Sequence, residues 1–124
     1  MKKVGKSVSF IAVNENRSRI GEGTLIGLKN GDLLYVLTEY IGNERADHSN
    51  ARLSACLSRD GGESWSDPVC IMEKDENAEN IMSPSLVRLN SGELGMIYLR
   101  KEKKYEHNRS SRTVLHLAGK AQRV

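Results

Sequence analysis

Apolar residues in this chain come in short runs separated by turn residues, a pattern typical of β-strands rather than helices. The first two runs, Gly23–Leu28 and Leu33–Thr38, lie on either side of Asn30-Gly31. An Asn-Gly pair between apolar runs is a strong hairpin signal, because both central residues of a type I′ turn need positive φ. The sequence therefore predicts a β-hairpin with a type I′ turn at this position.

The same pattern continues to about residue 100, and no segment of ten residues or more carries a helical apolar stripe. Turns are predicted at Asp60–Gly62 and Ser91-Gly92, because Gly and Asp favour turn conformations. Residues Val8–Ala12 are a further candidate strand. The remaining predicted strands are Arg52–Leu57, Val69–Met72, Ser85–Leu89 and Leu94–Leu99. The expected fold class is all-β.

An internal repeat relates the two predicted hairpins. Residues Thr24–Leu33 match Ser85–Leu94 at an offset of 61, with a hydroxyl residue, leucines, a glycine and an acid in register. A four-stranded unit with a period near 60 favours the blades of a β-propeller, although common blade types have about 40–50 residues. We expect one four-stranded antiparallel blade at about 23–72 and the start of the next at 84–100. The alternative is that two hairpins of this composition look alike by chance.

Charge divides the chain near residue 100. Residues 1–100 carry 12 Lys and Arg against 14 Asp and Glu, a net charge of −2, whereas residues 101–124 carry seven against two, a net charge of +5. A nucleic-acid-binding domain needs a basic folded face, so nucleic acid is not an expected partner. We expect a lead-in with an N-terminal strand at 1–16, a propeller fragment at 17–100 and a basic divergent tail at 101–124.

Composition predicts neither a membrane span nor a metal site. Apolar runs such as Phe10–Val13 are too short to span a bilayer. The basic start lacks the apolar stretch and cleavage sequence of a signal peptide, so a cytoplasmic location is the default. Two cysteines, Cys56 and Cys70, are too few for a four-cysteine metal site and are expected to be reduced, packed thiols. No cofactor is expected.

One motif occupies Ser58–Trp65. Its sequence, SRDGGESW, fits S-x-D-x-G-x-[ST]-W at all five specified positions. Asp60 can accept hydrogen bonds from turn amides, the glycines Gly61 and Gly62 tolerate positive φ, and the only Trp can cover the apolar base of the hairpin. The motif is identified as an Asp-box, or bacterial neuraminidase repeat. It marks a fold, and none of its residues is expected to be catalytic.

From about Arg17 to Arg100 the chain resembles the opening of a sialidase-type six-bladed β-propeller. An Arg-Ile pair precedes the first hairpin, an acid-bearing loop and the Asp-box follow, and SPSLVRLNSGELGMIYLR opens the next blade. The resemblance implies an N-terminal fragment of about one and a half blades of a sialidase-like glycoside hydrolase. Such enzymes remove terminal sialic acid or a related sugar from glycoconjugates, so the implied partner is a glycan. Six blades at this period would need roughly 360 residues.

The resemblance also implies two site residues. Sialidases hold the sugar carboxylate with three arginines, the first in an R-I-P element just before the first inner strand. Here Arg19-Ile20-Gly21 replaces that element, so Arg19 is the substrate-binding candidate. The family's acid/base aspartate lies about a dozen residues before the Asp-box, where Asp47 falls as the catalytic candidate. An aspartate shielded by a sugar would have a raised pKa, as a general acid requires. A solvated loop aspartate is the alternative.

Chain direction predicts where these two residues lie. Successive antiparallel strands alternate their ends, so Arg19 and Asp47 should lie near each other, and Asp60 should lie at the opposite end of the blade. The other two arginines and the Tyr/Glu nucleophile pair of a sialidase belong to later blades. This chain is therefore expected to be inactive alone, and its status as an enzyme stays open.

A single blade leaves its edges and faces uncovered, so the remaining propeller blades, or self-association, are expected to cover them. Two other functions stay open. Asp-box propellers include non-catalytic glycan-binding or scaffolding proteins, because fold does not imply function. The chain could also be a non-functional truncation product.

Overall fold

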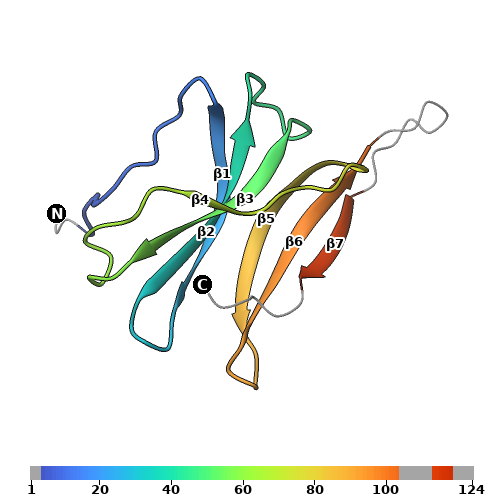
Figure 1. The fold of residues 1–124 in the computed structure, drawn as a ribbon. Coiled ribbons are helices and arrows are strands. Elements are labelled where there is room, and N and C mark those ends of the chain that lie inside the picture. Colours follow the sequence, from blue (N-terminus) through green and yellow to red (C-terminus); the bar gives the residue numbers. More distant parts are fainter. Residues whose placement is uncertain (1–3, 104–112, 119–124) are drawn as a thin grey trace.

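The structure is a computed structural model that describes residues 4–103 and 113–118, and it contains two antiparallel β-sheets (Figure 1). The first sheet has the strand order β1-β2-β3-β4 and the second the order β5-β6-β7. No helix occurs in these two described ranges, and the all-β expectation is confirmed. The strands are β1 (Arg17–Gly27), β2 (Leu33–Ile41), β3 (Ala51–Ser58), β4 (Val69–Met72), β5 (Ala78–Arg88), β6 (Leu94–Glu102) and β7 (Thr113–Ala118).

The β1–β2 and β5–β6 turns have the same hydrogen bonds. In the first turn, the Gly31 amide donates to the Leu28 carbonyl at 3.0 Å, and the Leu28 amide donates to the Asp32 carbonyl at 2.8 Å. In the second turn, the amides of Gly92 and Leu89 make the equivalent bonds at 2.8 and 2.9 Å. The two hairpins are thus copies of one structure, as the sequence repeat predicts.

The turn type, however, differs from the predicted one. Type I′ needs positive φ at both Asn30 and Gly31, but only Gly31 has it, at 93°. The turn is a three-residue loop in which a left-handed glycine follows a type I turn. The Asn30 side chain instead accepts a hydrogen bond from the Asp32 amide at 3.0 Å, which stabilises the turn without positive φ at Asn30. The hairpin prediction is confirmed, and the type I′ prediction is wrong.

Strand register repeats at the same offset. Thr24 pairs with Val36 between β1 and β2, and Ser85 pairs with Ile97 between β5 and β6, 61 residues later in each strand. Both β1 and β5 begin earlier than predicted, because register irregularities interrupt the alternation of side chains near their starts. These irregularities lie between Arg17 and Arg19, Ile20 and Gly23, Ala78 and Asn80, and Met82 and Ser85.

The hydrophobic core lies between the two sheets. Strand β5 contacts β1, β2 and β3, and Figure 1 shows it beside the first sheet. Burial of apolar surface at this interface holds the two repeats together. The buried core side chains come from both sheets and are Leu34, Val36, Leu53, Ala55, Ile81 and Met96.

Residues 8–12 do not form the strand that the sequence predicts. They border a groove together with Leu25, Tyr35 and Cys56, which come from three neighbouring strands of the first sheet. The segment therefore lies over the outer face of that sheet, the face turned away from β5. A chain lying over a face has no strand edge to pair with, so its apolar run makes no ladder.

The chain beyond residue 100 contains strand structure that the sequence did not predict. Strand β6 continues to Glu102, and β7 pairs with it antiparallel, with Lys101 opposite Thr113. The expected basic tail at 101–124 therefore includes a strand of the second sheet. Residues 104–112 and 119–124 of that tail, and residues 1–3 of the lead-in, lie outside the described residues.

Candidate functional site

Both candidate site residues lie at one end of the first sheet. Asp47 is in the loop between β2 and β3, and Arg19 is the third residue of β1. Asp60 follows β3, so it lies at the other end of that strand. The sequence places Arg19 just before the first inner strand, and that detail is wrong. Strand β1 already begins at Arg17, and its pairing with β2 is irregular between Arg17 and Arg19.

Arg19 and Asp47 form an ion pair. Nη1 of Arg19 donates to Oδ1 of Asp47 at 2.6 Å and to the carbonyl oxygen of Arg45 at 2.9 Å. The guanidinium carbon lies 4.7 Å from the centre of the Tyr40 ring, within the range of a cation–π interaction. Tyr40 is fully buried and gives the guanidinium a fixed support. The predicted proximity of Arg19 and Asp47 is confirmed.

The ion pair favours the charged form of Asp47. The hydrogen bond from Arg19, together with its positive charge, lowers the pKa of Asp47. Asp47 in turn raises the pKa of Arg19 through the same bond. The Asp47 side chain is 72% exposed. The raised pKa of a general acid is therefore not found in this chain, because the carboxylate is both solvated and paired with a cation.

A side chain from the second sheet holds the same loop. Asn80 in β5 is fully buried, and its Nδ2 donates to the carbonyl oxygens of Asp47 at 2.8 Å and Ser49 at 2.9 Å. Its Oδ1 is buried and has no hydrogen-bond partner within the described part of the chain. The sequence did not single out Asn80. The signal that identifies it is the internal repeat, which aligns it with Arg19 at the offset of 61.

A buried carboxylate lies on the outer face of the first sheet, away from the Arg19–Asp47 pair. Glu39 is 2% exposed and accepts hydrogen bonds from Arg17 at 2.6 Å, Arg52 at 2.9 Å and Ser54 at 2.5 Å. Burial acts to raise the pKa of Glu39, but the three donors prevail and lower it. The sequence does not distinguish Glu39 from a surface acid, because its partners come from separate strands. In the described structure these three donors satisfy the buried carboxylate of Glu39, which gives it a structural role.

The Ser58–Trp65 turn is closed by hydrogen bonds to Asp60. This carboxylate accepts from the Ser64 amide at 2.8 Å, the Ser64 hydroxyl at 2.5 Å and the Ser58 hydroxyl at 2.9 Å. These donors, those of Ser64 first, lower the pKa of Asp60 to about 2. Trp65 is half-buried and meets Tyr35 edge-on, with 6.4 Å between ring centres. The Asp60 carboxylate is hydrogen-bonded within the turn, so the turn has a structural role.

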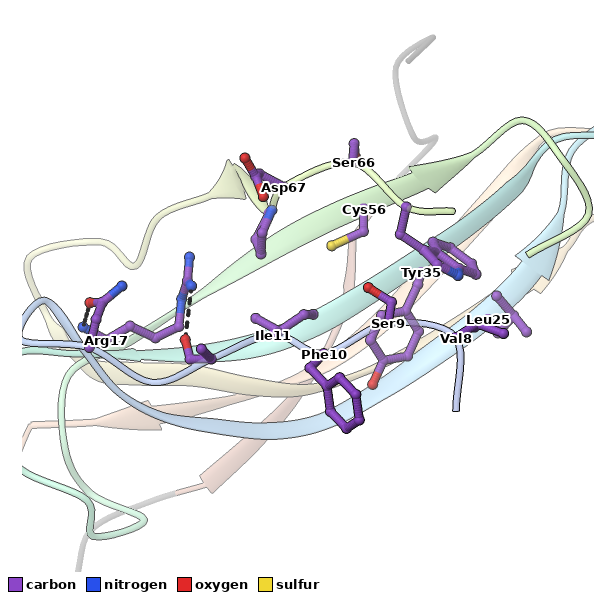
Figure 2. Close-up of a pocket in the computed structure, with 14 residues that line it drawn as sticks. Val8, Ser9, Phe10, Ile11, Arg17, Leu25, Tyr35, Cys56, Ser66 and Asp67 are labelled. Atoms are coloured by element: carbon purple, nitrogen blue, oxygen red, sulfur yellow. Dashed lines mark hydrogen bonds between the residues drawn. The ribbon is translucent and has the colours of Figure 1, made fainter. Parts of the chain in front are cut away.

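A groove in the described structure is a separate feature (Figure 2). It has a volume of about 530 Å³ and lies on the outer face of the first sheet. Residues 8–12 form one wall, and Leu25 and Tyr35 lie beside them. Phe10 is 84% exposed and Leu25 is 57% exposed. Its lining is mainly apolar and excludes the Arg19–Asp47 pair, so the groove is suited to packing rather than to the chemistry of that pair.

Other kinds of site find little support in the described ranges. Residues 4–103 and 113–118 contain no group of three or more His, Cys, Asp or Glu residues placed to hold a metal ion. No helix in the same residues is long and apolar enough to cross a membrane. Cys56 and Cys70 are free thiols, and burial raises the pKa of both.

Comparison with known proteins shows a relationship of fold. No protein-family model and no curated protein matches the sequence. A crystal structure of the NanB sialidase from Streptococcus pneumoniae, in complex with 2-[(3-chlorobenzyl)ammonio]ethanesulfonate, is similar with a TM-score of 0.59 and 16% identity. The similarity covers 77% of this chain and 18% of the sialidase chain. The chain therefore has a fold like part of a sialidase, and it spans less than a fifth of that protein's length.

Proposed function

We propose that this chain is the N-terminal part of a sialidase-like glycoside hydrolase, and that its Arg19–Asp47 end faces a carboxylated sugar. The observation that carries the proposal is the 2.6 Å ion pair between these residues. A guanidinium binds carboxylates through paired, charge-assisted hydrogen bonds. An acid held next to that guanidinium is within reach of a sugar bound there. The similarity in fold to the NanB sialidase supports the same proposal.

In this proposal Arg19 binds the substrate. Its hydrogen bonds to described residues use Nη1 alone, and a guanidinium carries five N–H donors. Nε and Nη2 therefore remain for a ligand carboxylate. Asp47 is the acid/base residue. A sugar covering Asp47 would displace water from its carboxylate and raise its pKa toward the value a general acid needs.

The chain alone is proposed to be inactive. Asp47 is exposed and its pKa is lowered, so it is ionised near neutral pH and has no proton to give a leaving group. A sialidase site also needs a nucleophile and further arginines. This chain spans 18% of the NanB chain, so those groups would come from other blades of a longer propeller. In the same reading, the Ser58–Trp65 turn is an Asp-box that marks the fold.

A glycan-binding or scaffolding propeller without catalysis is the second candidate. The lowered pKa of Asp47 favours it, because an ionised carboxylate accepts hydrogen bonds from sugar hydroxyls but cannot protonate a leaving group. The two candidates share the same binding end and differ in whether Asp47 becomes protonated when a glycan covers it. A non-functional truncation product is the third possibility, and specific glycan binding by the folded chain would exclude it.

The groove on the outer face supports a proposed partner. The inner face of the first sheet packs against β5, and Met96 of β6 joins the same core. On the outer face, by contrast, Phe10 and Leu25 leave apolar surface exposed. We propose that the remaining propeller blades cover this face in the longer protein. Self-association is the alternative, and sedimentation velocity of the chain separates the two. A monomer at micromolar concentration favours the remaining blades, and a dimer favours self-association.

NMR titration of the isotope-labelled chain with N-acetylneuraminic acid tests the proposed function. We expect the amide signals of Arg19 and Asp47 to shift, while those of Gly31, at the opposite end of the sheet, stay in place. N-acetylmannosamine has no carboxylate and is the control ligand, for which weaker shifts are expected. Arg19→Ala should remove the difference between the two sugars. Equal binding of both sugars by the unmodified chain would contradict the proposal.

A further inference from the structure

Asn80 occupies the position in the second repeat that Arg19 occupies in the first. Arg19 pairs with Tyr40 across β1 and β2, and Asn80 pairs with Lys101 across β5 and β6, an offset of 61 in each strand. A register irregularity immediately precedes each residue, at 17–19 in β1 and at 78–80 in β5. The two side chains therefore emerge from equivalent points near the start of each repeat's first strand.

Both side chains bind the same loop. Arg19 reaches it from the first sheet and holds the Arg45 carbonyl and the Asp47 carboxylate. Asn80 reaches it from the second sheet and donates to the carbonyl oxygens of Asp47 at 2.8 Å and Ser49 at 2.9 Å. The backbone at Asp47 is thus held by one repeat and its side chain by the other.

The buried side chain of Asn80 has one polar end that is paired and one that is not. The residue is 0% exposed, and its Oδ1 has no hydrogen-bond partner within the described ranges. A buried acceptor without a partner destabilises a fold, so this atom is a cost of placing Asn80 here. What Asn80 contributes is two hydrogen bonds, and both go to the loop that carries Asp47.

We infer that Asn80 is a positioning residue that clamps the backbone at Asp47 and Ser49 and thereby holds the Asp47 carboxylate against Arg19. The second repeat then controls the geometry of a site that lies on the first. The importance of this clamp for function rests on the proposed role of Asp47. The clamp itself can be tested without any ligand, so its failure is distinguishable from failure of the proposed function.

The direct test uses the unmodified chain. NMR detects scalar coupling across a hydrogen bond, from the donor nitrogen to the acceptor's carbonyl carbon. Coupling is expected from the Asn80 side-chain nitrogen to the carbonyl carbons of Asp47 and Ser49. Slow exchange of the Asn80 amide protons with solvent should accompany it. A folded chain with neither coupling nor slow exchange would overturn the inference.

Substitution tests the consequence for Asp47. In Asn80→Leu and Asn80→Ala the loop loses its clamp, so the NMR titration midpoint of the Asp47 carboxyl should move upward. The Ser49 amide should exchange roughly 5–10-fold faster, the factor that corresponds to the loss of about one net hydrogen bond. A folded Asn80→Leu chain with the wild-type Asp47 midpoint would overturn the inference. If neither variant folds, the coupling measurement on the unmodified chain decides.

Ser58→Ala is the matched control. Ser58 is nearly as buried as Asn80, at 1% exposed, and its hydroxyl donates to the Asp60 carboxylate and accepts from the Gly62 amide. Its loss should destabilise the chain at the opposite end of β3 and leave the Asp47 midpoint unchanged. An Asp47 midpoint that moves equally in Ser58→Ala would show general loosening of the fold and would also contradict the specific clamp.

Discussion

Arg19 and Asp47 are 28 residues apart in the sequence and form an ion pair with 2.6 Å between Nη1 and Oδ1. Arg19 is fixed against the buried ring of Tyr40, while Asp47 is on a loop that Asn80 holds from the second sheet. Because Asp47 is solvent-exposed, the pair adds little to stability. Its consequence is that a cation and an acid lie side by side at one end of the first sheet.

The first prediction concerns the charge of Asp47. Replacing Arg19 with Gln removes the positive charge and the charge-assisted hydrogen bond that lower the Asp47 pKa and leaves at most a neutral amide donor, so that pKa should rise toward the ordinary value of 3.8. Arg19→Lys keeps the charge and should retain part of the effect. Side-chain carboxyl NMR across an acid titration measures both variants. An unchanged midpoint in Arg19→Gln would show that the ion pair does not form in solution.

The second prediction concerns acid stability. The pKa of Asp60 is lowered from 3.8 to about 2 in the folded chain. A group with a lowered folded pKa stabilises the fold above its unfolded pKa, and that contribution is lost as pH falls through the folded value. Denaturant unfolding should therefore show stability declining between about pH 4 and pH 2. Asp60→Asn should be less stable at neutral pH and lose less stability in that window. An equal decline in both chains would exclude Asp60 as a cause.

The third prediction tests the packing of β1 with a matched pair of glycine substitutions. A Cβ at Gly23 would lie 2.5 Å from the Tyr35 hydroxyl oxygen and 2.7 Å from the Val36 carbonyl oxygen. Gly23→Ala should therefore destabilise the chain by about 1–3 kcal/mol. A Cβ at Gly27, in the same strand, meets no atom within 4 Å, so Gly27→Ala should be near neutral. Urea denaturation compares the two, and equal effects would contradict the described register.

The fourth prediction is that the 124-residue chain does not hydrolyse a fluorogenic sialoside. Asp47 is ionised and exposed, and positioning plus covalent attack, which supply much of the acceleration, need groups beyond Arg19 and Asp47. The assay compares the unmodified chain with Asp47→Asn, and both should match the rate without protein. Turnover that Asp47→Asn abolishes would overturn this prediction and show a complete site in the chain.

Much of the fold could be predicted from local pattern. Alternating apolar residues and turn glycines located all six strands between residues 17 and 102, because those signals arise from neighbouring residues. The approach of Arg19 to Asp47 followed from chain direction alone, since antiparallel strands alternate their ends. The early starts of β1 and β5 were missed, because register irregularities break the alternation.

What the sequence missed depends on contacts between distant segments. The buried state of Glu39 needs Arg17 and Arg52 from other strands, and the clamp by Asn80 needs the second sheet to pack on the first. The lowered pKa of Asp47 likewise follows from its contact with Arg19. The spacing of residues along the chain does not show which distant segments touch, so the sequence pattern alone could not predict these contacts.

The affinity of Asp47→Asn for N-acetylneuraminic acid tests the proposed site most directly. If Arg19 binds the sugar carboxylate through Nε and Nη2, the negative charge of Asp47 at Nη1 opposes the binding of a second carboxylate, and a neutral amide in its place should bind the sugar more tightly. The expected gain is about 2–5-fold over the unmodified chain, the range of an exposed ion pair, and Arg19→Ala should bind most weakly. Unchanged or weaker binding by Asp47→Asn, or wild-type binding by Arg19→Ala, would contradict a carboxylate site at Arg19.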